Sequence, residues 1–403
     1  MGASAPLELD ETFVQNPHQL YELLRAQAPV RKVTMMRGLD AWLVTRYDDV
    51  RAALADPRLA KNAGRIRELA QRQAEDKGLT RPGFDASLSA HMLNADPPDH
   101  SRLRKLVNKA FTSRTVARLQ PRIEQITDEL LDAMAGKENV DLLDTLAFPL
   151  PITVICELLG VPMDERDDFR VWSNILLSSD QGERVPEAAQ KMAEYLTKLV
   201  ASKRATPTED LLTELVEATE DGDRLSEEEL VGMAFLLMVA GHETTVNLIG
   251  NGVLHLLRNP DQLAALRAHP DLLPGAVEEI LRLEGPVNIA TIRFSAEPIT
   301  LGGQEIPAGE FVMVALSSAN RDPEKFADPD TLDITRPAGG HMAFGHGIHY
   351  CVGAPLARLE GQIALGKLIA RFPGLALAAE PEELVWRNST LMRGLTNLPV
   401  RTG

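Results

Sequence analysis

The chain has 403 residues, of which 44% are hydrophobic and 25% are charged, values that are ordinary for a soluble globular protein. Its net charge of −16 at pH 7 argues against nucleic acid as the main partner, because binding to phosphates requires a basic surface. The two cysteines, Cys156 and Cys351, lie far apart, which argues against a disulfide framework and favours a reducing compartment.

The first residues, MGASAPLELDETF, contain neither a basic stretch nor an apolar one, so we expect no signal peptide and no membrane anchor. The longest nearly apolar run, residues 230–241, has twelve residues and is too short to cross a bilayer. We therefore expect a cytoplasmic protein that binds no membrane. No internal repeat and no Gly/Ser linker divides the chain, so residues 1–403 are expected to form a single domain.

In chain order, the pattern predicts a mostly helical protein with strands near the start and again after residue 290. Residues 41–46 are expected to form a short strand followed by a helix. Residues 60–95 are polar with scattered Gly and Pro, and are expected to be a long loop with short helical pieces. Asp96, followed by two prolines, predicts the N-cap of the next helix.

The longest predicted helix begins after Ser226, which forms a capping box with Glu229, and runs to about Arg258. It is roughly 50 Å long, and its apolar middle predicts that it is buried. Shorter helices are predicted over residues 114–136, 151–160, 164–178, 186–204 and 274–284. A hairpin over residues 299–314, with Gly-Gly at its turn, and a final long helix between Cys351 and Phe372 complete the prediction.

The segment FGHGIHYCVG, residues 344–353, carries the first functional signal. Glycine lets a backbone approach a large flat group, and a cysteine just ahead of a helix is biased toward the thiolate because unpaired N–H groups stabilise an anion there. One alternative is a buried, inert cysteine. Another is a zinc site formed by Cys351 with His341, His346 and His349, although structural zinc prefers paired cysteines.

The same segment resembles the haem-binding loop of the cytochrome P450 family, F-G-x-G-x-H-x-C-x-G, at every fixed position. The resemblance implies a haem b whose iron takes the Cys351 thiolate as its proximal ligand. It also implies that Phe344 shields the sulfur and that His349 contacts a haem propionate. Gly345 and Gly353 are then expected to let the loop pack flat against the macrocycle.

A second signal is AGHETT, residues 240–245, in the middle of the long helix. A glycine there costs about 1 kcal/mol relative to alanine, and an acid and two threonines in an apolar helix need partners. Threonine can bend a helix by bonding back to a carbonyl group, which leaves either a polar kink without chemistry or a pocket for O₂ and water. The resemblance implies that Glu243 and Thr244 deliver protons and that Ala240 and Gly241 lie against the haem.

Glu279 and Arg282 are three residues apart on one helix face and can form an ion pair, which alone is a weak signal. Their position between the two motifs matches the E-x-x-R motif of the family. The resemblance implies that this pair and Arg336 stabilise the region that carries the cysteine loop, rather than take part in catalysis.

Further basic residues have two interpretations. His100, Arg104 and Arg293 are either solvated surface residues or, as the resemblance implies, partners of the haem propionates. Residues 101–114 contain five basic residues and no acidic one. This segment is either an ordinary solvated helix face or a docking site for an acidic ferredoxin, with contacts from Arg102, Lys105 and Lys109.

The resemblance covers the chain from about residue 16 to residue 399 and implies a soluble bacterial member of the family. The expected fold is mainly α with small β-sheets (α+β), with haem between the long helix and the cysteine loop. The expected protein is a monomer that receives electrons from a ferredoxin and a ferredoxin reductase supplied by NAD(P)H. It is expected to bind O₂ and to hydroxylate a C–H bond or transfer oxygen to an alkene.

The substrate is expected to be sizeable and mostly apolar, such as a macrolide, a steroid-like molecule or another secondary-metabolite skeleton. By family analogy it contacts side chains that could instead simply fill the core: Leu88, Met92, Leu176, Val239, Ile289, Ala290, Leu391 and Met392. The alternatives are a haem-binding sensor or carrier, a cysteine hydrolase, and a non-oxygenating haem–thiolate enzyme such as an isomerase, dehydratase or peroxygenase.

Overall fold

The computed structural model describes residues 6–36, 38–79, 87–162, 165–177, 183–219, 222–337 and 339–403. The chain divides into two compact units, which are described one at a time. The first contains residues 1–81, 251–351 and 381–396, and the second contains residues 82–250, 352–380 and 397–403. Both units consist mainly of helices with small β-sheets, which confirms the predicted fold class. That residues 1–403 form a single domain stays a prediction.

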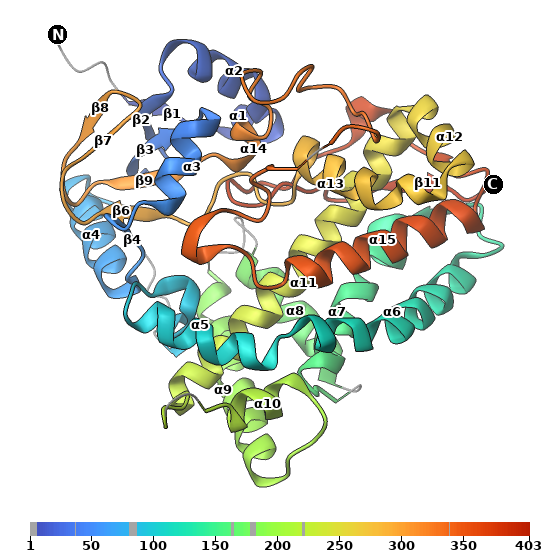
Figure 1. The fold of residues 1–403 in the computed structure, drawn as a ribbon, viewed down its shortest axis with the longest axis horizontal. Coiled ribbons are helices and arrows are strands. Elements are labelled where there is room, and N and C mark those ends of the chain that lie inside the picture. The colour runs from blue at the N-terminus through green and yellow to red at the C-terminus, as the bar shows by residue number, and fades with distance from the viewer. Residues whose placement is uncertain are drawn as a thin grey trace. The chain divides into compact units, whose positions relative to one another are not determined.

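A six-stranded sheet organises the first unit, with the strand order β1-β2-β3-β9-β6-β4. The strands are β1 (Leu7–Glu8), β2 (Val30–Thr34), β3 (Asp40–Val44), β4 (Leu59–Ala60), β6 (Arg293–Ser295) and β9 (Phe311–Val314). Strand β3 pairs in parallel with β9, so the sheet joins two distant parts of the sequence (Figure 1). Phe311 and Met313 pack in one apolar cluster and Val312 and Val314 in another, as alternation along a strand requires.

The predicted hairpin is present but shorter than expected. Strands β7 (Ile299–Leu301) and β8 (Gln304–Ile306) pair around Gly302 and Gly303, whose φ angles are +50° and +77°. Strand β9 lies in the larger sheet instead, because the turn at Gly309, with a φ of +84°, separates it from β8.

The helices of the first unit include several that the sequence does not predict. They are α1 (Glu11–Gln15), α2 (Pro17–Gln27), α3 (Tyr47–Ala55), α4 (Ala63–Asp76), α12 (Pro260–Ala268), α13 (Leu273–Glu284) and α14 (Leu316–Ala319). The prediction of a loop at residues 63–76 is wrong. Asn62 caps α4 by accepting from the N–H of Arg65, and Ile66, Leu69, Ala70 and Ala74 pack on its apolar side against the core. The rest of the 60–95 prediction includes residues 80–86, which lie outside the described residues.

The second unit is mainly helical. Its helices are α5 (Asp99–Ala110), α6 (Ser113–Met134), α7 (Pro149–Leu158), α8 (Arg166–Leu177), α9 (Val185–Ala205), α10 (Leu211–Glu217) and α15 (Ala354–Arg371). The short helices η1 (Ser87–Ser89), η2 (Met92–Asn94) and η3 (Leu143–Ala147) belong to it as well. A three-stranded sheet joins β10 (Ala376–Leu377), β11 (Pro399–Arg401) and β5 (Asn139–Asp141). Figure 1 shows α15 running beside α6, and ion pairs from Lys367 to Asp128 and from Arg371 to Asp132 connect the two helices.

The helices that the sequence predicts are found to within a few residues, whereas α1, α2, α10, α12 and α14 were not predicted. The predicted N-cap at Asp96 is wrong. Helix α5 begins at Asp99, after Pro98, with no side-chain cap. Asp96 and Pro97 each precede a proline, and a residue in that position is disfavoured from helical backbone angles.

Helix α11 (Glu227–Arg258) is the long helix that the sequence predicts, and its capping box is confirmed. The N–H of Ser226 donates to Glu229 Oε2 over 2.8 Å, and the N–H of Glu229 donates to Ser226 Oγ over 3.1 Å. Among the described residues, α11 is the one helix long and apolar enough for a membrane span, but 78% of its most apolar window is buried in the protein. Such burial is what a core helix requires.

Candidate functional site

The cysteine loop of the first unit is held by its own backbone. Gly345 and Gly347 have φ angles of +75° and +74°, and a Cβ atom on Gly347 would lie 2.8 Å from the carbonyl oxygen of Leu54 on α3. The N–H of Cys351 donates to the carbonyl oxygen of Phe344 over 3.0 Å and closes the loop. Only glycine fits position 347, because both the backbone angle and the close approach exclude a side chain.

The two cysteines differ in burial. Cys156 is fully buried in α7, and burial raises the pKa of its thiol to about 12. Cys351 is exposed, and α15 begins three residues after it. Within the described part of the chain, which includes both cysteines, no disulfide forms. Cys351 is therefore the cysteine that can act as a thiolate ligand.

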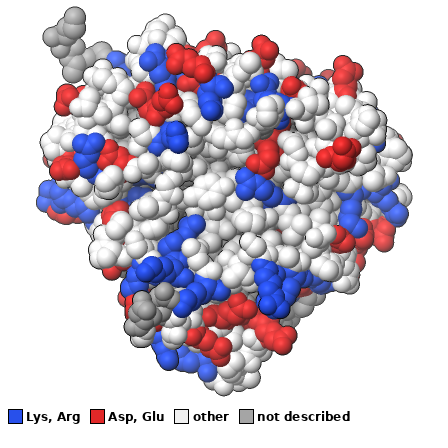
Figure 2. All heavy atoms as spheres, in the orientation of Figure 1, with Lys and Arg blue, Asp and Glu red and all other residues white. Residues whose placement is uncertain are grey.

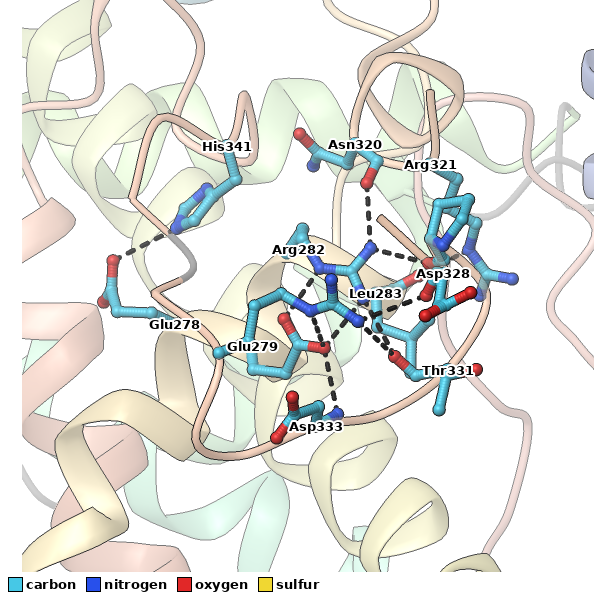
Figure 3. Close-up of polar contacts among 12 residues, drawn as sticks. Glu278, Glu279, Arg282, Leu283, Asn320, Arg321, Asp328, Thr331, Asp333 and His341 are labelled. Atoms are coloured by element: carbon cyan, nitrogen blue, oxygen red, sulfur yellow. Dashed lines mark hydrogen bonds and ion pairs between the residues drawn. The ribbon is translucent and has the colours of Figure 1, made fainter. Parts of the chain in front are cut away.

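A buried charge network lies just ahead of the cysteine loop in the chain (Figure 3). Arg282 donates from Nε to Glu279 Oε2 over 2.7 Å and from Nη2 to Glu279 Oε1 over 2.8 Å, and Arg336 Nε donates to the same carboxylate over 3.1 Å. Arg282 Nη1 also donates to the carbonyl oxygen of Asn320, whose side-chain oxygen accepts from the N–H of Met342 over 2.5 Å. The structure thus brings Glu279, Arg282 and Arg336 together and connects them to Met342, just ahead of the loop; their fold-stabilising role stays a prediction.

The zinc alternative finds no support in the geometry. Among the described residues, no group of three His, Cys, Asp or Glu side chains is arranged to hold a metal ion. His341 instead contacts Glu278 Oε2 over 3.1 Å (Figure 3).

Helix α11 carries the AGHETT segment in the second unit, and part of one face there is accessible. Ala240 is exposed, and Val239, Gly241 and Thr244 are half-buried, although the helix is otherwise mostly buried. The hydroxyl of Thr244 donates to the carbonyl oxygen of Ala240 over 2.8 Å, which confirms the predicted back-bond. Glu243 is only 1% exposed, so a carboxyl group lies inside the protein beside this accessible face.

The predicted propionate partners are found in both units. His100 on α5 and Arg293 on β6 are each 3% exposed, and Arg104 and His349 are half-buried. Arg293 Nη1 donates to the carbonyl oxygen of Thr291 over 3.4 Å. Because His100 and Arg104 belong to one unit and Arg293 and His349 to the other, their meeting at a single ligand stays a prediction.

Lys61 is a residue that the sequence interpretation missed. It is 1% exposed, follows β4 directly, and donates from Nζ to Thr291 Oγ1 over 2.5 Å. The pairing of β4 with β6 places Lys61 beside Arg293, which also contacts Thr291. Lysine is rarely buried, and this one lay in a segment predicted to be a polar loop, so nothing in the sequence pattern indicated its burial.

The predicted substrate contacts fall into two groups. In the second unit, Leu88 and Met92 are buried and Leu176 is half-buried. Gly232 of α11 permits close packing against this part of the chain, since a Cβ atom on it would lie 2.5 Å from the carbonyl oxygen of Ala90.

In the first unit, the segments 287–290 and 390–392 lie together. The N–H of Asn288 donates to the carbonyl oxygen of Leu391 over 2.8 Å, and Val287 pairs with Met392. Ile289 and Met392 are buried, and Ala290 and Leu391 are half-buried. Their contact with a substrate stays a prediction.

Basic side chains gather over α5 (Figure 2). Arg102 forms ion pairs with Asp223 and Glu229, and Lys109 Nζ donates to the carbonyl oxygen of Thr219 over 2.6 Å. Lys105 is exposed. Because two acidic side chains neutralise Arg102 locally, Lys105 is better suited than Arg102 to attract an acidic partner.

Known proteins are similar to this chain over nearly its whole length. The family model for "Cytochrome P450" matches residues 152–390. "Cytochrome P450 107B1" of Saccharopolyspora erythraea is 60% identical over 397 residues, which is 98% of each chain. "Vitamin D(3) 25-hydroxylase" of Pseudonocardia autotrophica is 51% identical over 393 residues, 97% of this chain and 95% of that one. The solved structure of the tirandamycin C-bound P450 monooxygenase TamI has a TM-score of 0.92 and 55% identity, and covers 99% of this chain and 100% of its own.

Proposed function

We propose that this chain, which belongs to the cytochrome P450 family, hydroxylates a sizeable and mostly apolar small molecule with electrons from a ferredoxin. As a family member it has the P450 fold and is a haem–thiolate monooxygenase that acts on a small-molecule substrate and O₂ with electrons from redox partners. The observation that carries the proposal is the exposed Cys351 thiol on a glycine-built loop.

The residues present fit the haem that the family carries. Cys351 supplies an ionisable sulfur, whereas burial keeps Cys156 a thiol. Gly345 and Gly347 carry no side chain, so a flat group can approach the backbone at these two positions, and Ala240 is a small exposed residue on α11. We assign the iron ligand to Cys351 and the propionate contacts to His100, Arg104, Arg293 and His349.

When bound, the haem iron and its thiolate activate O₂ for insertion of one oxygen atom into a C–H bond. The protein supplies position and protons. The Thr244 hydroxyl uses its hydrogen to bond the Ala240 carbonyl oxygen, so the lone pairs of Oγ1 are directed to accept from a water molecule. The nearly buried Glu243 carboxyl group then holds the proton that this water passes on, which assigns the acid and alcohol roles to these two residues.

An apolar substrate is supported by the side chains assigned to its contacts, which carry no charge: Leu88, Met92, Leu176, Val239, Ile289, Ala290, Leu391 and Met392. Similar proteins point to the same class. One relative is named for hydroxylation of vitamin D(3), and the TamI structure contains tirandamycin C. We therefore propose a macrolide, a steroid-like molecule or another secondary-metabolite skeleton, oxidised in the cytoplasm.

The proposed electron donor is an acidic ferredoxin that docks on α5. Lys105 is exposed on this helix, and complementary charge accelerates such encounters. Lys109 is exposed as well, and Arg102 is assigned a smaller part because of its ion pairs.

The experiment that tests the proposed function uses the holoenzyme with a surrogate ferredoxin, ferredoxin reductase and NADPH. Candidate macrolides and steroids are added, and the product formed per NADPH consumed is measured by mass spectrometry. We expect a product heavier by one oxygen atom, and at least a tenfold lower yield per NADPH in Thr244→Ala, as loss of a proton-delivering group predicts.

A matched control is Thr197→Ala on α9, because Thr197 makes the same back-bond to the carbonyl oxygen of Ala193 over 2.8 Å. This control should keep the wild-type yield. A product of unchanged oxygen content, or turnover with peroxide but not with O₂ and electrons, would replace the proposal with an isomerase, dehydratase or peroxygenase.

A further inference from the structure

His242, in the middle of α11, is fully buried and contacts another helix. Its Nδ1 atom lies 2.9 Å from the carbonyl oxygen of Met238, and its Nε2 atom lies 3.2 Å from Ser173 Oγ on α8. A carbonyl oxygen can only accept, so Nδ1 must carry a hydrogen. In the neutral ring, Nε2 then accepts from the Ser173 hydroxyl, which fixes one tautomer.

The ring of His242 is also fixed from a third direction. Phe148, which directly precedes α7, lies edge-on to it, with ring centroids 5.6 Å apart and an interplanar angle of 76°. Side chains or backbone from α8, α11 and the start of α7 therefore hold this imidazole. A ring held on three sides has little freedom to turn away from its neighbours.

The next residue is the assigned proton donor. His242 Nε2 lies 3.8 Å from Glu243 Oε2, and the exposed fractions of the two side chains are 0% and 2%. This separation is a close contact rather than a hydrogen bond, and Nε2 already accepts from the Ser173 hydroxyl. Because the ring is held in place, it limits the positions that the neighbouring Glu243 carboxyl group can take inside the protein.

We propose that His242 is a positioning residue that orients the Glu243 carboxyl group, and that Ser173 fixes His242 in this role. The inference rests on the proposed proton-delivering role of Glu243. It extends that role from the acid–alcohol pair of the motif to a third residue on α11 and a fourth on α8.

The contact with α8 connects proton delivery to the substrate. Ser173 and Leu176, a proposed substrate contact, are three residues apart and share one side of α8. A substrate packed on Leu176 restrains this turn of the helix, and with it the hydrogen bond from Ser173 to His242. A bound substrate of the right shape thereby orients Glu243.

The test compares His242→Phe, which fills the same space without polar atoms, with Ser173→Ala and His242→Gln. Gln places an amide oxygen where it can still accept from Ser173. In the reconstituted holoenzyme we expect His242→Phe and Ser173→Ala to lower product per NADPH three- to tenfold with little change in KM, and His242→Gln to retain more of it. The double variant should lose no more than His242→Phe alone, because both changes remove one connection.

A second readout does not depend on turnover. Amide hydrogen exchange of residues 166–177 in the haem-loaded protein should become faster in His242→Phe and Ser173→Ala. Thr127→Val is the matched control, since Thr127 is fully buried in α6 and its hydroxyl bonds only within its own helix, to the carbonyl oxygen of Ile123. It should leave both readouts at wild-type values.

Wild-type product yield and wild-type exchange in Ser173→Ala would overturn the inference, even if His242→Phe failed to fold. Glu243→Gln separates this failure from that of the proposed function. If Glu243→Gln lowers the yield and Ser173→Ala does not, only the role of His242 and Ser173 is wrong. If Glu243→Gln also has no effect, the proposed proton donor is wrong as well.

Discussion

Glu360 of α15 is a carboxyl group that the protein buries at a large free-energy cost. It is 1% exposed, and within the described part of the chain its Oε2 atom has no hydrogen-bond partner. Burial raises the pKa of Glu360 from 4.5 to about 8. At neutral pH the folded protein therefore keeps this side chain protonated, whereas the unfolded chain ionises it.

The sign and size of the effect follow from this difference. Because the folded-state pKa is raised, the stability that Glu360 contributes is fully present below pH 4.5 and is lost as pH rises toward 8. One pKa unit corresponds to about 1.4 kcal/mol, so the loss is about 3 kcal/mol at pH 7 and about 5 kcal/mol well above pH 8. Glutamine has nearly the same shape but cannot ionise. Glu360→Gln should therefore remove the pH-dependent loss of stability.

The assay is thermal unfolding of Glu360→Gln and wild type at pH 5 and pH 8. The difference between their free energies of unfolding should grow by about 3 kcal/mol over this interval. The unfolding entropy of a chain of this length is about 0.8 kcal/mol per kelvin, which converts the growth to about 4 °C in Tm. Glu194→Gln, the same substitution on an exposed residue of α9, is the control. A Tm difference between Glu360→Gln and wild type that is the same at both pH values would refute the reasoning.

Three further predictions concern the loop, its supporting network and the docking face. Arg282→Met leaves the buried Glu279 carboxylate without its main partner. In denaturant titration it should lower the free energy of unfolding by about 3–5 kcal/mol, and a loss below 1 kcal/mol would contradict the buried network. Gly347→Ala places a Cβ against backbone at a φ of +74° and should reduce haem content per purified protein, whereas full haem loading would show that the loop tolerates a side chain. In stopped-flow measurements, Lys105→Glu should slow ferredoxin-driven reduction severalfold at low salt and less at high salt. The control Lys198→Glu on α9 should reduce at the wild-type rate. Equal rates for Lys105→Glu and wild type would show that the ferredoxin does not dock on α5.

The features that the sequence predicts well are local ones. The capping box of α11 needs only Ser226 and Glu229, three residues apart, and the Cys351 loop is one short segment with glycines at 345, 347 and 353 just before a helix. Helix α4 is missed because its apolar side is narrow, formed by Ile66, Leu69, Ala70 and Ala74, and the polar residues around it read as a loop. Composition alone cannot distinguish a polar surface helix from a polar loop.

Contacts between distant residues were beyond sequence reasoning. Nothing near Lys61 indicates that it is buried against Thr291, because this contact depends on the pairing of β4 with β6. The bond from Ser173 to His242 joins residues 69 positions apart, and neither side chain belongs to a pattern that names the other. Such contacts arise from the packing of whole elements, which a periodic pattern constrains only loosely.

The measurement that tests the central claim most directly is the absorption spectrum of the purified protein, reduced with dithionite and exposed to carbon monoxide. The assignment of Cys351 as iron ligand predicts a strongly red-shifted Soret band, as a thiolate ligand gives, and its disappearance in Cys351→Ala. A haem band at the shorter wavelength typical of histidine ligation that is unchanged in Cys351→Ala would contradict the assignment, as would no haem band after haem was supplied during expression.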